Sequence, residues 1–203
     1  FSVEESTRLA VLLRAGALPA EMNFLEERTI GPELGQDSID AGRLAALIGL
    51  ACVAVYMIAC YGIFGLMANL ALTINIALIM AVLSAIGATL TLPGIAGIVL
   101  TMGMAVDANV LIYERIREEL RTGANPRKAV EEGFSRAFSA IMDSNVTGLL
   151  TAVIMFWLGS GPVRGFAVTL GLGIITSMFT AVYVTRLIVE LWLDWKRPKA
   201  IVV

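Results

Sequence analysis

The chain has 203 residues, of which 58% are hydrophobic and 16% charged, and its formal net charge is −2. Soluble domains of this length carry about a quarter charged residues, so the composition favours a membrane protein over a soluble one. The charges fall in blocks: residues 1–43 hold 12 of the 32, residues 44–106 none, residues 107–142 another 12 and the remainder 8. Alternating water-exposed and lipid-buried segments produce such a partition.

The first 43 residues carry eight acidic residues and four Arg. The stretch "STRLAVLLRAGALP" has apolar residues at helical spacing and predicts a helix that ends at Gly16 and Pro19. "MNFLEERTIGPELG" predicts a strand-like start with a Gly/Pro exit. Neither piece can bury a core alone. We therefore expect residues 1–43 to be the membrane-proximal end of a larger external α+β domain, followed by a linker.

Five apolar segments reach the length of about 20 residues that a membrane-spanning helix needs. They cover residues 44–64, 69–91, 94–113, 141–159 and 166–188. The uncharged stretches "GLMAN" and "LPG" join the first three, and "GSGPVRG" joins the last two. All three stretches are predicted to be tight turns, and in "LPG" and "GSGPVRG" Gly and Pro interrupt the helix. The sequence thus predicts an all-α membrane protein, with a five-helix bundle at residues 44–190 and a tail at 191–203.

The connection at residues 114–140 is expected to be structured. The third helix should continue through "ERIREEL" to about Gly123, and Asn125 and Pro126 then supply an N-cap and a first-turn residue. Apolar residues follow at helical spacing, which predicts an amphipathic helix along the membrane surface. Such a helix either covers the floor of the bundle or serves regulation.

Orientation follows from the Lys and Arg residues, which gather on the cytoplasmic side of membrane proteins. The connection after the third helix holds six of them and the tail after residue 190 holds three, whereas the loop after the fourth helix has only Arg164. The sequence therefore predicts that residues 114–140 and the tail are cytoplasmic and that residues 1–43 are external.

Asp107 is a carboxylate within an apolar run, 13 residues into the predicted third helix. A charged Asp near the membrane centre costs about 2.5–3.5 kcal/mol, and burial disfavours the charged form. The chain has no His, and no Lys or Arg lies at a similar depth in the predicted helices. Asp107 is then protonated much of the time, or its cation comes from another chain. Either makes it a candidate proton carrier; the alternative is an interhelical hydrogen bond without further function.

Several polar residues near this position form a predicted supporting path toward the cytoplasm. Glu114 follows Asp107 by seven residues and should share its helix face. The fourth helix opens with "MDSNVTG" near the inner membrane surface. The predicted path consists of Asn109, Glu114, Asp143, Asn145 and Thr147.

The sequence does not indicate an enzymatic site, a metal site or a disulfide. The sequence contains no Gly-rich phosphate loop, no cluster of metal ligands and no nucleophile–base pairing. Cys52 and Cys60 are eight residues apart, about 12 Å along one helix, which is too far for a disulfide. We expect no enzymatic activity, no cofactor and no metal.

The stretch "TLPGIAGIVLTMGMAVDANVLIYERIREEL" resembles the signature of the SecD family of bacterial protein-export subunits. Further similar stretches cover nearly the whole chain: "LRAGALP", "EERTIGPELGQDSI", "DSNVTGLLTA" and "GSGPVRGFAVTLGLGIITSMFTAVYVTR". The resemblance implies a member of the resistance–nodulation–division superfamily that pairs with SecF, so that two six-helix halves form a pseudosymmetric bundle.

The same resemblance implies a function. Members work beside the SecYEG channel in the inner membrane and use the proton gradient to help draw preproteins outward. Asp107 matches the family's proton-coupling Asp, and its cationic partner would lie on the SecF side. Residues 1–40 match the end of the family's periplasmic domain, so the first transmembrane helix and most of that domain are expected to lie outside this sequence. Two alternatives are a structural anchor without proton coupling and a small-molecule exporter of the same superfamily.

Overall fold

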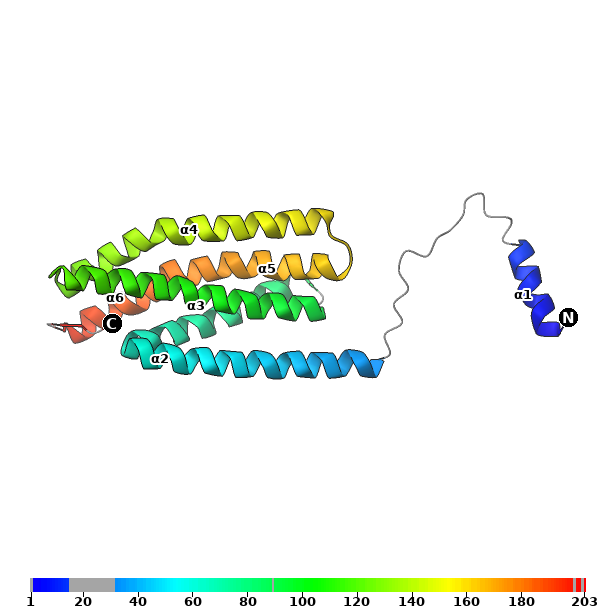
Figure 1. Ribbon diagram of the computed structural model, residues 1–203, viewed down its shortest axis with the longest axis horizontal. Helices are drawn as coiled ribbons and strands as arrows, with labels where there is room; N and C mark the ends of the chain where they lie inside the picture. Colours follow the sequence, from blue (N-terminus) through cyan, green and yellow to red (C-terminus); the bar gives the residue numbers. More distant parts are fainter. Residues whose placement is uncertain (1, 15–31, 89, 199, 202) are drawn as a thin grey trace. The chain divides into compact units, whose positions relative to one another are not determined.

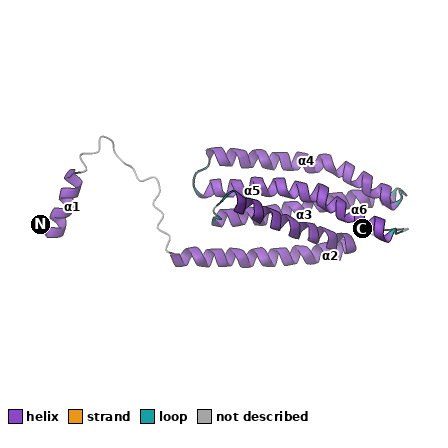
Figure 2. Cartoon of the chain, turned by 180° about the vertical axis from the view of Figure 1, so that it is seen from behind, coloured by secondary structure: helices purple, strands orange, loops and turns teal. Residues whose placement is uncertain are grey.

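The computed structural model describes residues 2–14, 32–88, 90–198, 200–201 and 203. Within these ranges all regular structure is helical and no strand occurs (Figure 2). The chain divides into two units, Phe1–Gly35 and Gln36–Val203, which we describe separately. The expected all-helical architecture is therefore confirmed for the described residues.

Helix α1, Val3–Arg14, lies in the first unit. Its start is a reciprocal capping arrangement: the Glu5 backbone N–H donates to Ser2 Oγ (3.2 Å), and the Ser2 N–H donates to Glu5 Oε2 (2.9 Å). The helix expected in "STRLAVLLRAGALP" is confirmed as far as Arg14, and its expected end at Gly16 and Pro19 lies outside the described residues. The strand-like start expected in "MNFLEERTIG" lies outside the described residues, and the "PELG" that follows is helical.

Helix α2, Pro32–Ala85, reverses its direction at Gly62 (Figure 1). Gly62 has φ 53° and ψ −120°, a backbone conformation that Gly adopts without steric cost. Asn69 Nδ2 donates to the carbonyl oxygen of Ala54 at 3.0 Å, although the two residues would lie about 22 Å apart in a straight helix. The expected turn at 65–69 is thus displaced to Gly62, and the second half ends at Ala85 instead of residue 91.

The remaining helices follow in order: α3 Leu92–Arg121, α4 Pro126–Leu158, α5 Pro162–Phe179, the π-helical turn η1 Thr180–Val184, and α6 Thr185–Lys196. Thr91 and Asn125 cap α3 and α4 by accepting backbone N–H groups, which confirms the N-cap expected at Asn125. α4 is a single helix, so the amphipathic segment expected as a separate surface helix continues directly into the apolar one. No proline interrupts it after Pro126.

Helix α3 lies at the centre of the bundle and contacts α4 and α5 closely. Gly97 and Gly173 sit at α3–α5 contacts with Thr169 and Thr101, and Gly133 of α4 lies against Ile116 of α3. Small residues at such positions let helix backbones approach in membrane proteins. Near Gly62, the Tyr113 hydroxyl donates to the Phe64 carbonyl at 2.9 Å, and the Phe64 ring packs edge-on against Tyr113.

Four helices of the described chain are long and apolar enough to cross a membrane. They comprise Ile39–Ala85, Leu92–Arg121, Pro126–Leu158 and the continuous segment Pro162–Lys196. Large apolar side chains on their outer surfaces are exposed, for example Val55 at 68%, Leu66 at 60% and Leu150 at 60%. A surface of this kind is suited to lipid.

Candidate functional site

Asp107 is held at the middle of α3, as its 16th residue of 30. It belongs to an exposed stripe along this helix that also contains Leu100, Gly103 and Leu111. These positions recur every three or four residues, so they share one face. Among these four positions, Asp107 alone is charged.

The carboxylate borders a small hollow of about 50 Å³ between α3, α4 and α5. Ser144 and Asn145 of α4 contribute polar groups to the lining, and Met104 and Ile174 contribute apolar ones. Since one molecule of liquid water occupies about 30 Å³, the hollow has the size for one or two waters. The structure thus sets a titratable group beside a small polar recess.

Asp107 makes no hydrogen bond or ion pair with any residue in the described part of the chain. It is exposed, and its near neighbours on α3 are apolar. An ionised carboxylate facing lipid is costly. Asp107 is therefore a carboxylate on an apolar helix face with no partner among the described residues.

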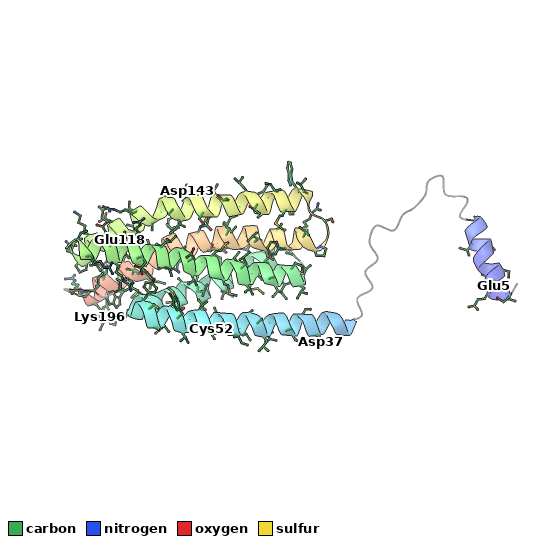
Figure 3. The ribbon with its side chains drawn as sticks, in the orientation of Figure 1. Glu5, Asp37, Cys52, Glu118, Asp143 and Lys196 are labelled. Atoms are coloured by element: carbon green, nitrogen blue, oxygen red, sulfur yellow. The ribbon has the colours of Figure 1, made fainter. Side chains whose placement is uncertain are left out.

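The predicted supporting residues on α4 separate into two groups. Asn145 lines the hollow with Asp107 and donates from Nδ2 to the Ile141 carbonyl at 2.7 Å. Asp143 is exposed on α4 (Figure 3). Thr147 is exposed on the same helix, and neither residue lines the hollow. Ser144, which also lines the hollow, was not predicted from the sequence. Its position next to Asn145 was the signal that could have indicated it.

Asn109 faces the bundle interior instead of the hollow. It is 3% exposed, and its Oδ1 accepts a hydrogen bond from the Thr185 hydroxyl at 3.0 Å. The same hydroxyl lies 3.2 Å from the Thr180 carbonyl across η1. Asn109 thus ties α3 to the junction of η1 and α6, a contact between residues 76 apart that sequence spacing does not indicate.

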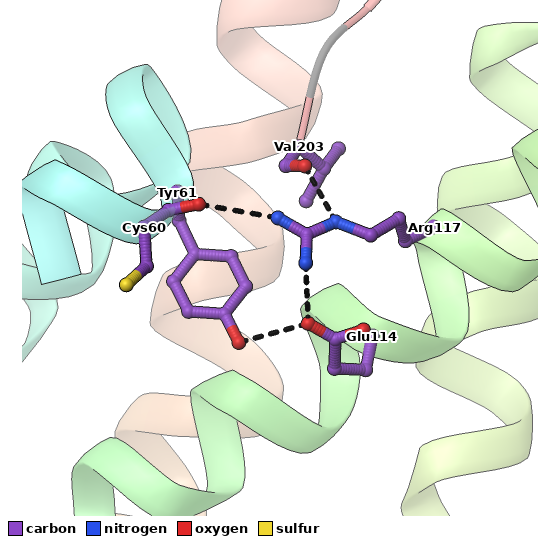
Figure 4. Close-up of polar contacts among 5 residues, drawn as sticks. All are labelled: Cys60, Tyr61, Glu114, Arg117 and Val203. Carbon is purple, nitrogen blue, oxygen red and sulfur yellow. Dashed lines mark hydrogen bonds and ion pairs between the residues drawn. The ribbon is translucent and has the colours of Figure 1, made fainter.

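Glu114 also lies away from the hollow, in a polar cluster around Arg117 (Figure 4). Glu114 Oε1 accepts from the Tyr61 hydroxyl at 2.9 Å and from Arg117 Nη1 at 2.6 Å. Arg117 further donates to the carbonyl oxygens of Cys60 (3.1 Å) and Val203 (2.7 Å). One guanidinium therefore links the α2 reversal, α3 and the segment after α6. This cluster was not predicted from the sequence. The i, i+3 spacing of Glu114 and Arg117 was the available signal for their ion pair, and the two carbonyl contacts have no such signal.

Replacing Arg117 with Lys is expected to lower the free energy of unfolding by about 1–3 kcal/mol, because an ammonium cannot reproduce three divergent hydrogen bonds. Unfolding of the protein in mixed detergent micelles measures the change. Arg115→Lys is the matched control, since Arg115 is half exposed and pairs only with Glu118 among the described residues. Equal stability of the two variants would contradict a structural role for the Arg117 cluster.

The described residues form neither a metal site nor a disulfide. No group of three or more His, Cys, Asp or Glu side chains is arranged to hold a metal ion there. Cys52 and Cys60 are free and exposed. The candidate site is consequently the carboxylate of Asp107 and its hollow.

Long apolar helices packed through glycines, with one carboxylate inside an apolar face, define a polytopic helical membrane protein. The family model of the C-terminal part of protein export membrane protein SecD/SecF matches residues 14–195. The chain belongs to the SecD/SecF family of protein export membrane proteins.

Individual relatives agree with this assignment. The chain is 63% identical to "Protein translocase subunit SecD" of Rhodobacter capsulatus over 203 residues and 58% identical to that of Desulfurispirillum indicum over 196 residues. These matches cover 100% and 97% of this chain, but 37% and 38% of the relatives. The chain thus spans little more than a third of the length of these curated relatives.

A solved structure is similar in fold as well as in sequence. The crystal structure of SecDF from Thermus thermophilus, described as a translocon-associated membrane protein, superposes with a TM-score of 0.84 at 47% identity. The match covers 100% of this chain and 28% of that one. A second structure, SecDF in a super-membrane-facing form, has a TM-score of 0.78 at 48% identity and covers 98% of this chain and 27% of that one.

Proposed function

We propose that this chain is the membrane part of a protein-export subunit that couples proton movement to preprotein translocation. The observation that carries the proposal is Asp107: an exposed carboxylate at the middle of α3, on an apolar face and without a partner in the described chain. Gaining a proton removes its charge and changes which surface can pack against that face. Proton binding at Asp107 then becomes a means of altering helix packing.

The proposed partners follow from the family and from this unpaired charge. A SecF-type subunit covers the Asp107 face and supplies a cation to this carboxylate, which has no partner among the described residues of this chain. A SecYEG-type channel and the preprotein complete the assembly in the bilayer of the bacterial inner membrane. The names "protein translocase subunit" and "translocon-associated", carried by the relatives, support these partners.

We further propose that the chain crosses the membrane five times. The reversal at Gly62 divides the candidate span Ile39–Ala85 into residues 39–61 and 63–85, of 23 residues each. At 1.5 Å per residue each half is about 35 Å long, enough for a hydrocarbon core of about 30 Å. With the other three candidate helices, this gives five spans.

The proposed orientation places the Arg117 end of the bundle in the cytoplasm. Arg127 pairs with Asp194 at 3.0 Å, and Arg117 donates to the Val203 carbonyl, so the basic connection and the basic C-terminal region lie together. Their shared charge supports a cytoplasmic location by the positive-inside rule. Residues 1–43 are then periplasmic.

The proton gradient supplies energy of the required size. One charge crossing 100 mV releases about 2.3 kcal/mol, so a potential of about 150–200 mV yields about 3.5–4.5 kcal/mol per proton. Shifting a two-state element from 1:99 to 99:1 requires about 5.5 kcal/mol. One proton can therefore bias the helix packing strongly, although it does not complete the shift alone.

Proton flux tests the coupling and separates it from a structural anchor. The protein and its membrane partner are reconstituted into vesicles with an internal pH dye, and a proton gradient is imposed. We expect flux with the native protein and with Asp143→Asn, and flux at the level of empty vesicles with Asp107→Asn. Equal flux through the native protein and Asp107→Asn would reject proton transfer at Asp107.

A further inference from the structure

Two adjoining hollows lie between the first half of α4 and the segment formed by η1 and α6. One, of about 300 Å³, is lined mainly by apolar and aromatic side chains, among them Phe138, Val182 and Tyr183. The other, of about 200 Å³, is lined largely by charged side chains, including Arg127, Glu131 and Glu190. Arg186 lines both. The two hollows therefore meet at this residue.

Along the axis of α4, the lining changes from charged in one hollow to apolar in the other. Arg127 lies at the start of α4, and Phe138 lies 11 residues further, about 16 Å along the helix. The charged hollow is thus at the end of the bundle, and the apolar hollow lies deeper. A recess that is apolar inside and charged outside fits an amphiphile with its head at the membrane surface and a chain in the hydrocarbon region.

The charged hollow contains both signs in equal number, two Arg and two Glu. Arg186 Nε donates to Glu190 Oε1 at 2.7 Å, and each of these side chains is 47% exposed. Arg127 is 78% exposed and pairs with Asp194. Exposed ion pairs of this kind contribute little to stability, so their groups can exchange partners with a ligand at small cost.

We propose that this groove binds a zwitterionic phospholipid with a primary ammonium headgroup, phosphatidylethanolamine. Arg127 and Arg186 bind the phosphate, Glu131 and Glu190 accept hydrogen bonds from the ammonium, and one acyl chain lies against Phe138 and Tyr183. A purely anionic headgroup leaves the two carboxylates facing a like charge. A quaternary ammonium carries no N–H to donate to them. The proposal rests on the membrane placement given above and is independent of proton transfer at Asp107.

Competition between lipids tests the headgroup. The purified complete protein is exposed to equal amounts of phosphatidylethanolamine, phosphatidylglycerol and phosphatidylcholine with identical acyl chains, and the retained lipid is counted by native mass spectrometry. We expect phosphatidylethanolamine to be retained about fivefold more than either competitor, a ratio that corresponds to about 1 kcal/mol, the net contribution of one typical hydrogen bond. Equal retention, or preference for either competitor, would overturn the proposal.

A double variant that removes the two carboxylate charges tests the location of the site. Glu131→Gln with Glu190→Gln is expected to remove the preference for phosphatidylethanolamine over phosphatidylcholine and to increase retention of phosphatidylglycerol, because two Arg then remain without opposing carboxylates. Glu118→Gln, which alters a half-exposed carboxylate outside the groove, should retain the native preference. A double variant with the native preference would place the lipid elsewhere. Competition on the native protein remains decisive if the double variant does not fold.

Discussion

Asp107→Asn is expected to abolish the part of preprotein export that depends on the proton gradient. Asn has nearly the same shape as a protonated Asp but cannot release a proton, so the α3 face stays permanently in its uncharged form. Export into inverted membrane vesicles, compared with and without an uncoupler, measures the gradient-dependent part. We expect this part to fall at least tenfold, whereas export driven by ATP alone persists.

Two further variants separate titration from packing. Asp107→Glu keeps a titratable group on the same face and is expected to restore part of the gradient-dependent export. Asp143→Asn changes an exposed carboxylate that does not line the Asp107 hollow and should have no effect. The proposal fails if Asp107→Asn exports normally, or if Glu and Asn at position 107 give the same defect.

Gly133→Ala is expected to destabilise the bundle by about 1–3 kcal/mol, the usual cost of overpacking. A Cβ at Gly133 would overlap the Ile116 side chain and would lie 2.9 Å from the Ile116 backbone N and 3.1 Å from its Cα. Because the obstacle includes the backbone of α3, relief requires the two helices to move apart. Unfolding in mixed detergent micelles measures the loss.

Gly49→Ala is the matched control for this variant. A Cβ at Gly49 meets no atom within 4 Å, and Ala is preferred over Gly in a helix by about 1 kcal/mol. This variant should therefore be neutral or slightly more stable. If Gly133→Ala behaves in the same way, close contact of α3 and α4 does not contribute to stability.

Much of the helical architecture could be predicted from the sequence, because long apolar segments and their Gly/Pro interruptions are local signals. The cap at Asn125 and the helix through "ERIREEL" were predicted and are confirmed. The reversal at Gly62 was not predicted, since the chain contains 19 glycines and local pattern does not reveal which of them reverses the direction of a helix. Its neighbour Gly65 lies directly against the Met57 carbonyl, a contact that exists only in the folded turn.

The candidate site, like the fold, could be predicted from the sequence only in part. The sequence identified Asp107, because a charge inside an apolar run is visible without a structure. Its surroundings depend on how α4 packs against α3, which determines that Asn145 lines the hollow and that Asp143 does not. Asn109 and Glu114 have separate partners, Thr185 and the pair Tyr61–Arg117. The Asn109–Thr185 and Tyr61–Glu114 contacts join residues 76 and 53 positions apart and leave no local pattern, whereas Glu114 and Arg117 lie at i, i+3 spacing.

The π-helical turn at Thr180–Val184 determines which side of α6, the helix that follows it, faces the interior of the bundle. Buried residues continue at four-residue intervals through this turn, from Ser177 and Ala181 to Thr185, Val189 and Leu193. A regular α-helix advances about 100° per residue, so such a stripe would otherwise drift around the axis. Shortening the turn by one residue would rotate α6 by roughly that angle. Val189 and Leu193 would then point away from the interior, so this short turn tolerates substitution far better than a change of length.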